Sequence, residues 1–410
     1  MQNNRSANPS LLLVTRNFPP LVGGMERLLF NVFKELGKSF SVSLVGPAGC
    51  GEHVQPGTPL AVCPHRPVWR FLLRCQWNTL LLAKRTNPHL VFSGSGVTVL
   101  AALIAGRLLK VPVVTYLHGL DIVADSIVYR SCFLPAIRKV DGIICNSRHT
   151  ARLARDAGIS AAVNILYPGV TLPVRVGPIG GGAFRERIGA MGRPILLSVG
   201  RLTPRKGIAE FVEKSLPAIV AVYPEVLHVI VGSEPKDAIG AGGGMRKRIM
   251  DTAKRLGLGG NILLLGNVDD QTLEKAYEAA LVHVFPVIHQ PGDVEGFGMV
   301  AVEAAAHGLP TVAFAQGGVV DAVRDGVSGV LVPEGHYEAM AEVILKYLRG
   351  GDAMPSRDSC IGFAEGFSWE IFGEKLRGIC RGYLHGNPLR SHGWPGAGCG
   401  GRAEAAGRRK

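Results

Sequence analysis

The stretch that decides the fold reads VFPVIHQPGDVEGFGMVAVEAAAHGLP and spans residues 284–310. An apolar run at 282–285 ends in a loop containing glycine and proline, which opens directly into an amphipathic helix starting near 297–298. The first N–H groups of a helix lack intrahelical partners and lie at the positive end of its dipole. The stretch therefore predicts a strand, a ligand-sized loop and an anion-binding helix start, flanked by Glu295 and Glu303.

Taken alone, the same stretch fits an ordinary capped helix of an α/β domain equally well, so composition and the rest of the chain must decide. With 410 residues, 47% apolar and 19% charged, the chain resembles a soluble globular protein with two domains. The net charge of +13 favours acidic partners such as nucleic acid, anionic lipid or a phosphorylated small molecule. Part of this charge lies in the glycine- and arginine-rich tail, which we expect to be disordered.

Cysteine spacing and hydropathy indicate a cytoplasmic protein. The eight cysteines form no CxxC pair, which favours reduced thiols over disulfides or zinc. No apolar run is long enough for a signal peptide or a membrane span, so any membrane contact is expected to be peripheral.

Short apolar runs alternate with helical stretches along the chain. Strands that are apolar on both faces and alternate with helices are typical of a parallel sheet covered on both sides. In the first half, such runs lie at 10–16, 41–46, 89–94, 112–119, 141–147 and 163–169. In the second half they lie at 194–201, 226–232, 261–266, 281–286, 310–315 and 328–332. Helices are expected between them, including one over 207–222.

The predicted fold class is therefore α/β, with two Rossmann-like α/β/α domains. We place the first domain at 1–172, a glycine- and proline-rich linker at 173–193 and the second domain at 194–367. A closing helix at 368–385 and the tail at 386–410 complete the chain.

Two such domains bind a ligand between the C-terminal ends of their sheets. In the first domain, Gly23 and Gly24 immediately precede a helix and His118 follows a buried strand. In the second, Arg201 and Lys206 follow a strand and supply two cations near the same point. A packed structural histidine and solvent-facing charges remain open as simpler explanations of these residues.

Six motifs in a fixed order resemble the family 4 retaining nucleotide-sugar glycosyltransferases, which have the GT-B fold. The resemblance covers about residues 10–385. The motifs are Gly23-Gly24-Met25-Glu26, HGLD at 118–121, CNSRHT at 145–150, GRLTPRKG at 200–207, EGFGMVAVE at 295–303 and FSWE at 367–370.

The resemblance implies two domains facing each other across a deep cleft, with the closing helix returning to the first domain. It implies that Arg201 and Lys206 neutralise the donor diphosphate and that His118 approaches the reacting sugar. Glu295 would contact the transferred sugar and Glu303 the ribose, while backbone around 266–268 would contact the base. The implied donor-binding set is Gly23, Gly24, Asn146, Gly296, Phe297, Gly298, Met299 and Glu303.

The resemblance also implies retention, no obligatory metal and no cofactor, because the nucleotide sugar is a substrate. The chain agrees in having no Asp-x-Asp on a predicted cleft loop. The HQPGDV loop at 289–294 is similar to subfamilies that often use GDP-mannose, which makes mannose the first choice and a UDP-hexose the alternative. The expected acceptor is a glycan or lipid-linked molecule of cell-surface polysaccharide or glycolipid synthesis.

Other hypotheses stay open. Residues 65–85 combine cations, two tryptophans and leucines. This composition fits a helix that lies on the inner face of an anionic membrane, and it also fits an ordinary helix packed on the sheet. A GT-B nucleotide-sugar epimerase would share the same cleft. Nucleic-acid binding is disfavoured, because the charge outside the tail is dispersed and no recognition module is present.

Overall fold

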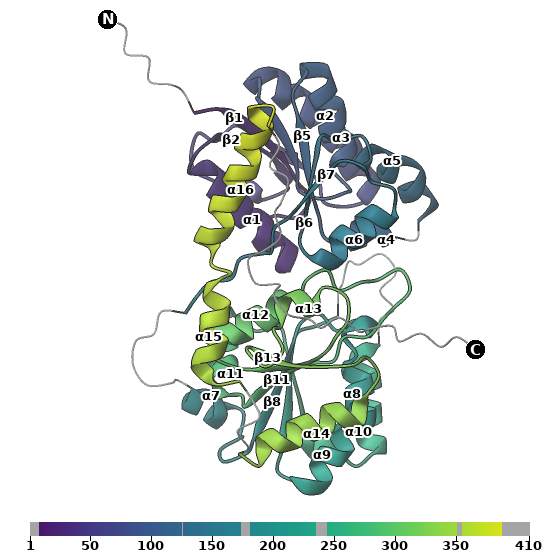
Figure 1. Cartoon of the computed structure of the whole chain (residues 1–410), viewed down its shortest axis with the longest axis vertical. Helices are drawn as coiled ribbons and strands as arrows, with labels where there is room; N and C mark the ends of the chain where they lie inside the picture. The colour runs from purple at the N-terminus through teal and green to yellow at the C-terminus, as the bar shows by residue number, and fades with distance from the viewer. Residues whose placement is uncertain (1–7, 125, 174–180, 235–243, 351–354, 388–410) are drawn as a thin grey trace, which may run out of the picture.

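The computed structural model of the chain contains two parallel β-sheets with helices on both faces (Figure 1). One sheet has the strand order β3-β2-β1-β4-β5-β6-β7 and the other β10-β9-β8-β11-β12-β13. The predicted α/β class with two Rossmann-like domains is therefore confirmed. Apart from residues 386 and 387, the expected tail lies outside the described part. The structure describes residues 8–124, 126–173, 181–234, 244–350 and 355–387.

The first sheet forms because its strands are short apolar runs, most of them buried on both faces. Its strands are β1 (Ser10–Val14), β2 (Ser41–Pro47), β3 (Leu60–Cys63), β4 (Leu90–Ser93), β5 (Val113–Leu117), β6 (Gly142–Cys145) and β7 (Ala162–Ile165). The helices are α1 (Gly24–Gly37), η1 (Cys50–His53), α2 (Val68–Thr86), α3 (Val99–Leu109), α4 (Leu120–Val123), η2 (Tyr129–Phe133), α5 (Leu134–Ile137) and α6 (Arg148–Asp156).

The second sheet follows the same pattern. Its strands are β8 (Ile195–Val199), β9 (Leu227–Val231), β10 (Ile262–Gly266), β11 (Val282–Phe285), β12 (Thr311–Phe314) and β13 (Gly329–Val332). The helices up to the last strand are α7 (Gly181–Arg187), η3 (Pro204–Lys206), α8 (Ile208–Lys214), α9 (Leu216–Val222), α10 (Met245–Arg255), η4 (Gly259–Asn261), α11 (Asp270–Ala279), α12 (Met299–Ala306) and α13 (Val319–Ala322). The final helices are α14 (Tyr337–Leu348), α15 (Arg357–Glu365) and α16 (Trp369–Leu384).

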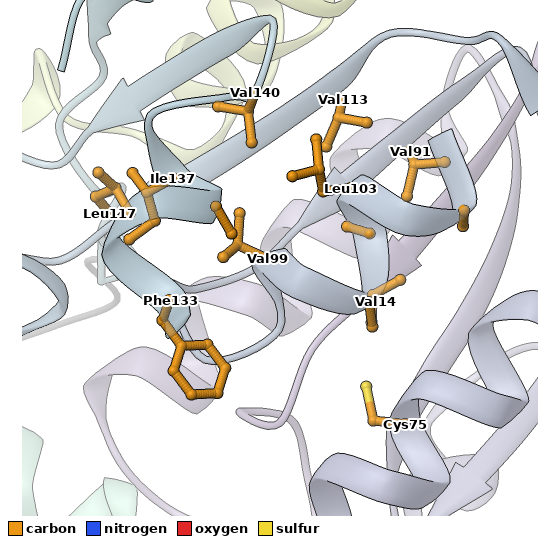
Figure 2. Close-up of a cluster of buried hydrophobic side chains, with 14 of the residues drawn as sticks. Val14, Cys75, Val91, Val99, Leu103, Val113, Leu117, Phe133, Ile137 and Val140 are labelled. Atoms are coloured by element: carbon orange, nitrogen blue, oxygen red, sulfur yellow. The ribbon is translucent and has the colours of Figure 1, made fainter. Parts of the chain in front are cut away.

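Two apolar cores cover the two faces of the first sheet. On one face, side chains of α2, α3, η2 and α5 pack against the strands, and Figure 2 shows Cys75, Leu103, Phe133 and Ile137 among them. On the other face, α1 and α16 pack together. The helical layer made of α2, α3 and α5 therefore lies on the opposite face of the sheet from α1 and α16.

The last helix that the structure describes returns to the first domain. Helix α15 packs on α12 of the second domain, whereas α16 packs on α1 of the first (Figure 1). Phe372 and Leu376 of α16 are buried in the first-domain core. Arg377 Nη1 lies 2.6 Å from Oε2 of the buried Glu35 on α1. The implied return of the closing helix is thus confirmed.

Two local expectations were wrong. The helix predicted over 207–222 is divided into α8 and α9 at Ser215. Pro217 lies in the first turn of α9, where it has no N–H to continue the preceding helix. The strand β3 was not predicted, because its four residues are mostly half-buried or exposed and lack a continuous apolar signal.

The described residues contain no disulfide and no membrane-spanning helix. The seven cysteines in this part are free, and all except Cys132 are buried. Among the helices described, none has the length and apolar character needed to cross a bilayer.

Buried histidines stabilise the second domain only while they are neutral. His228 Nε2 lies 2.9 Å from Ser198 Oγ, whose own proton is donated to Val284 O, so this nitrogen is the donor. Burial lowers the pKa of His228 to about 3. Burial, followed by the charge of Lys206, lowers the pKa of His283 to about 3 as well.

We therefore predict acid destabilisation between pH 6.5 and 3. In this pH window the two histidines are protonated in the unfolded chain but stay neutral in the folded protein. The free energy of unfolding therefore falls as the pH falls. Each histidine contributes about 2 kcal/mol to the loss at pH 5. In the His228→Gln variant, the drop in calorimetric midpoint between pH 7 and pH 5 should be smaller by about 4–8 °C. His336→Gln, at an exposed position of the same domain, is the control and should behave as wild type.

Candidate active site

Each sheet reverses its strand order at one point. The reversal lies between β1 and β4 in the first sheet and between β8 and β11 in the second. Ligands of open α/β sheets bind beside the C-terminal ends of the strands at such switch points. The residues singled out by the sequence follow β1, β5, β6, β8 and β11 or lie on α12.

Lys206 and Glu295 form a buried ion pair between the loops after β8 and β11. Lys206 Nζ lies 2.7 Å from Glu295 Oε2, and Arg205 Nε lies 3.3 Å from the same oxygen. Arg205 Nη1 also binds Asp293 at 3.0 Å. Lys206 Nζ lies 4.6 Å from the centre of the Phe285 ring. Two buried cations thus meet one buried carboxylate at the end of a central strand.

These neighbours keep Glu295 ionised despite its burial. Burial alone would raise the pKa of this carboxyl, but the charges of Lys206 and Arg205 outweigh it and lower the pKa to about 2. The pKa of Lys206 is lowered by burial, with Glu295 opposing that change. Because the Glu295 pKa is depressed, its contribution to stability is present above about pH 4.5 and is lost as the pH falls towards 2.

His118, after β5, packs directly against the Gly296 loop of the other domain. A Cβ at position 296 would lie 2.1 Å from the His118 carbonyl oxygen and 2.7 Å from Asn146 Nδ2, so only glycine fits. His118 Nε2 lies 2.8 Å from Gly94 O, and since a carbonyl can only accept, this nitrogen bears the proton. Asn146 is buried and accepts a hydrogen bond from Thr150 Oγ1 at 2.7 Å.

Glu303 lies on α12 and is bound from the first domain. Arg27 of α1 places Nη1 at 2.9 Å from Glu303 Oε1 and Nη2 at 3.2 Å from Asp270 Oδ1. Tyr277 Oη donates to Glu303 Oε2 at 3.3 Å. One guanidinium therefore bridges two carboxylates across the domain boundary.

The N-termini of α1 and α12 lie close together at this boundary. A Cβ on Gly24 would lie 3.7 Å from Met299 Sδ. Gly298 has φ of 99°, a left-handed conformation that favours glycine at the residue before α12. The buried Phe297 ring stacks on Tyr167 at a centroid distance of 5.5 Å. Free amide groups of both helices are thus available near the buried ion pair.

The structure brings most of the expected residues to one place. Arg201 is exposed, although its charge contributes to lowering the pKa of both Lys206 and Glu295. Arg205 and Arg27 also belong to the site, although neither was predicted from the sequence. Arg205 stands beside Lys206 in the same motif, and Arg27 follows the predicted glycine pair, but their partners are 90 and 276 residues away in the chain.

The nucleotide base was expected near 266–268. A surface hollow of about 550 Å³ is lined there by Asn267 and Val268, together with residues of β10 and α11 and the end of α7. In the part of the chain that the structure describes, no group of three or more His, Cys, Asp or Glu side chains is placed to hold a metal ion.

Loss of the Arg27 bridge should open the two domains. The Arg27 side chain is 42% exposed, so solvent screening limits the bridge to about 0.5–1 kcal/mol, or roughly a two- to five-fold change in the open population. Arg27→Ala should therefore increase the radius of gyration measured by small-angle scattering at low salt. Arg148, which pairs with Asp321 across the same boundary, keeps the domains partly together.

The matched control is Lys38→Ala, which removes a similarly exposed ion pair with Glu35 inside the first domain. Its scattering should equal that of wild type. Equal scattering by Arg27→Ala and wild type at low salt would contradict the prediction.

Two family models match consecutive parts of this chain. The model "Glycosyltransferase Family 4" matches residues 22–172, and "Glycosyl transferases group 1" matches residues 183–365. The first match covers most of the first sheet and its helices. The second covers the whole second sheet and ends at α15.

One curated relative matches nearly the whole chain at low identity, and another matches about half of it. The chain is 26% identical over 395 residues to a GDP-mannose-dependent alpha-(1-6)-phosphatidylinositol monomannoside mannosyltransferase of Mycolicibacterium smegmatis, covering 91% of this chain and 98% of the relative. It is 30% identical over 229 residues to a D-inositol 3-phosphate glycosyltransferase of Segniliparus rotundus. That match covers 55% of this chain and 48% of the relative.

Solved structures share the fold. Anabaena HepE, in complex with UDP and glucose, superposes with a TM-score of 0.74 at 20% identity, covering 91% of this chain and 99% of that one. Sucrose-phosphate synthase from Thermosynechococcus elongatus superposes with a TM-score of 0.72 at 20% identity, covering 92% and 100%. With the two family matches and the two facing domains, the chain belongs to the family 4 glycosyltransferases of the GT-B fold.

Proposed function

We propose that this glycosyltransferase moves a hexose from a nucleoside diphosphate sugar to a glycan or lipid-linked acceptor, with retention of configuration. The main supporting observation is the Lys206–Glu295 pair at 2.7 Å, which places a buried cation and a carboxylate beside the Gly296–His118 contact. GDP-mannose is the first choice of donor, because two relatives have that donor in their names. Cytoplasmic synthesis of a glycolipid or polysaccharide is the proposed setting.

In the proposed reaction, the bond between the anomeric carbon and the β-phosphate oxygen breaks. The acceptor oxygen bonds to that carbon on the same face, and its proton passes to the departing phosphate oxygen. The products are the glycoside and the nucleoside diphosphate. Lys206, Arg201 and the first amides of α12 stabilise the negative charge that grows on the diphosphate, so no metal ion is required.

The carboxylates hold the two sugar units of the donor. Glu295, ionised because its pKa is about 2, accepts hydrogen bonds from hydroxyls of the transferred sugar. Glu303 accepts from the ribose hydroxyls once Arg27 has released Oε1. His118 lies against Gly296 and approaches the sugar from the first domain.

The deciding experiment is a mass-spectrometric screen of donors against acceptors. GDP-mannose, UDP-glucose and UDP-galactose are each incubated with inositol phosphate, phosphatidylinositol mannoside and extracted lipids, because both groups of relatives have inositol in their names. Transfer from GDP-mannose, unchanged by EDTA and giving the α-linked product, is expected. Transfer from a UDP-sugar but not from GDP-mannose would show that the donor is a UDP-sugar. A β-linked product, or loss of activity in EDTA, would overturn the proposed mechanism.

The epimerase alternative is tested in the same screen. An epimerase would convert a nucleotide sugar into its isomer with no acceptor present. Isomer formation without transfer to any acceptor would reject the proposed glycosyl transfer.

A further inference from the structure

Helix α2 presents a row of large apolar side chains to solvent. Trp69, Leu73, Trp77 and Leu81 are 58%, 65%, 60% and 52% exposed. They recur every fourth residue, so they form a row about 18 Å long that winds gradually round the helix. Exposed apolar residues that are contiguous mark a contact surface, whereas single ones do not.

The exposed row lies on a different face of α2 from the one that packs in the core of the first domain. Phe71, Cys75 and Leu82 are almost fully buried in the core of the first domain. They lie on the opposite side of the helix from the tryptophans. The helix is therefore held in place by its inner face, and its outer row is available to a partner.

The surroundings of the row are cationic. The sequence has no Asp or Glu between residues 53 and 120. Arg70, Arg74, Lys84 and Arg85 of α2 are exposed, and the Arg70 guanidinium lies 5.3 Å from the centre of the Trp69 ring. The other basic residues of this stretch are Arg66, Arg107 and Lys110.

Helix α3 extends the same surface. It packs beside α2 in one helical layer, and its Ile104 and Leu108 are 37% and 64% exposed. Their spacing of four residues again places them on one side of the helix. We call the six exposed apolar residues of α2 and α3, with the exposed cations of α2, the α2 surface.

We propose that the α2 surface docks the protein on the face of an anionic lipid bilayer. Tryptophan and leucine side chains suit the boundary between headgroups and acyl chains, and a helix that lies along this boundary can turn its exposed apolar row towards the acyl chains. Each nearby Lys or Arg is attracted by the negative potential of acidic lipids. An anionic bilayer therefore matches both the exposed apolar row and the cations around it.

A second copy of the chain fits this surface poorly. A two-fold symmetric contact places the same patch on both sides. The exposed cations of α2 would then face the cations of the other copy with no acidic side chain from residues 53–120 between them. Such like-charge contacts oppose association.

Docking has a consequence for the acceptor that rests on the proposed function. Helix α2 follows β3, so it starts at the edge of the sheet that faces the second domain, with Trp69 at that end. A bilayer on the α2 surface would meet the domain expected to bind the acceptor. A lipid-linked acceptor would then reach the enzyme without leaving the membrane.

The test is flotation of the full chain with vesicles of phosphatidylcholine alone or with 30% phosphatidylglycerol. Wild type should float with the anionic vesicles, and the bound fraction should fall as salt is raised. Trp69→Ser/Trp77→Ser and Arg70→Glu/Arg74→Glu should each lower the bound fraction at least ten-fold. Thermal midpoints should stay unchanged, because all four side chains are largely exposed.

The control is Lys247→Glu/Lys254→Glu, which reverses two exposed charges on α10 of the second domain. It should float as wild type does. Equal flotation of all variants, or an equal loss in the control, would overturn the proposal. A dimeric wild type that becomes monomeric in the tryptophan variant, measured by light scattering, would show a protein contact instead.

Donor turnover with a soluble acceptor separates this proposal from the proposed function. The α2 variants should retain wild-type turnover, because none of their residues belongs to the candidate active site described above. Vesicle binding without any glycosyl transfer would leave the docking proposal intact and reject the proposed reaction.

Discussion

Replacing Lys206 by alanine is expected to lower kcat/KM for the donor about 100- to 1,000-fold. The reason is that Lys206 is a buried cation, 7% exposed, next to the expected position of the diphosphate. A fixed charge in a site shielded from water stabilises a developing negative charge far more than a solvated one does. Steady-state assays with saturating acceptor measure the effect.

The same substitution should also destabilise the protein. Without Lys206, the buried Glu295 carboxylate keeps only Arg205, at 3.3 Å, which already binds Asp293. Removing one partner of a buried ion pair costs about 3–5 kcal/mol. A fall in thermal midpoint is therefore expected together with the fall in turnover.

A double variant separates these two effects. Lys206→Met/Glu295→Gln removes both charges and should recover most of the lost midpoint. Its turnover should stay low, because the cation that faces the phosphate is still missing. Recovery of both turnover and stability would show that Lys206 acts only as a structural counter-ion.

Replacing Glu303 by alanine is expected to raise the donor KM about 10- to 100-fold. Hydrogen bonds between a carboxylate and ligand hydroxyls contribute about 1.5–3 kcal/mol. Glu303 is well placed for them, because its carboxylate is 15% exposed and held by Tyr277. Isothermal titration with the nucleoside diphosphate measures the binding directly.

Arg27→Ala is the control for this second experiment. It also breaks the Arg27–Glu303 bridge but leaves the carboxylate in place. If Glu303 binds the ribose, the two variants should differ in donor affinity, and Glu303→Ala should bind the donor more weakly than Arg27→Ala. Equal affinities would mean that Glu303 serves only to hold the domains together.

Local patterns were sufficient to predict the sheets and the loops of the candidate site. Strand and helix periodicities depend on nearby residues, so the stretch at 284–310 indicated β11, its loop and α12 to within two residues of their ends. The break at Ser215 and the strand β3 depend on a single proline and on edge pairing, for which the sequence signal is weak.

Individual side-chain pairs between distant residues could not be predicted. Arg27 and Glu303 are 276 residues apart, and nothing in either motif indicates that they meet. For α2, the sequence indicated an amphipathic basic helix but left open which apolar side chains pack inside. The structure buries Phe71 and Leu82 and leaves Trp69 and Trp77 outside, because only one face of the helix meets the sheet.

Helix α16 has a further consequence for how the protein is made. The first domain lacks part of its core until α16 supplies Phe372, Leu376 and Tyr383, and Arg377 reaches Glu35 across 342 residues of chain. A ribosome must therefore synthesise the entire second domain before the first can be completed. Domains usually fold in the order in which they leave the ribosome. Here the N-terminal domain can complete its core only after α16 has been synthesised. A nascent chain that stops before residue 369 therefore has an incomplete N-terminal domain.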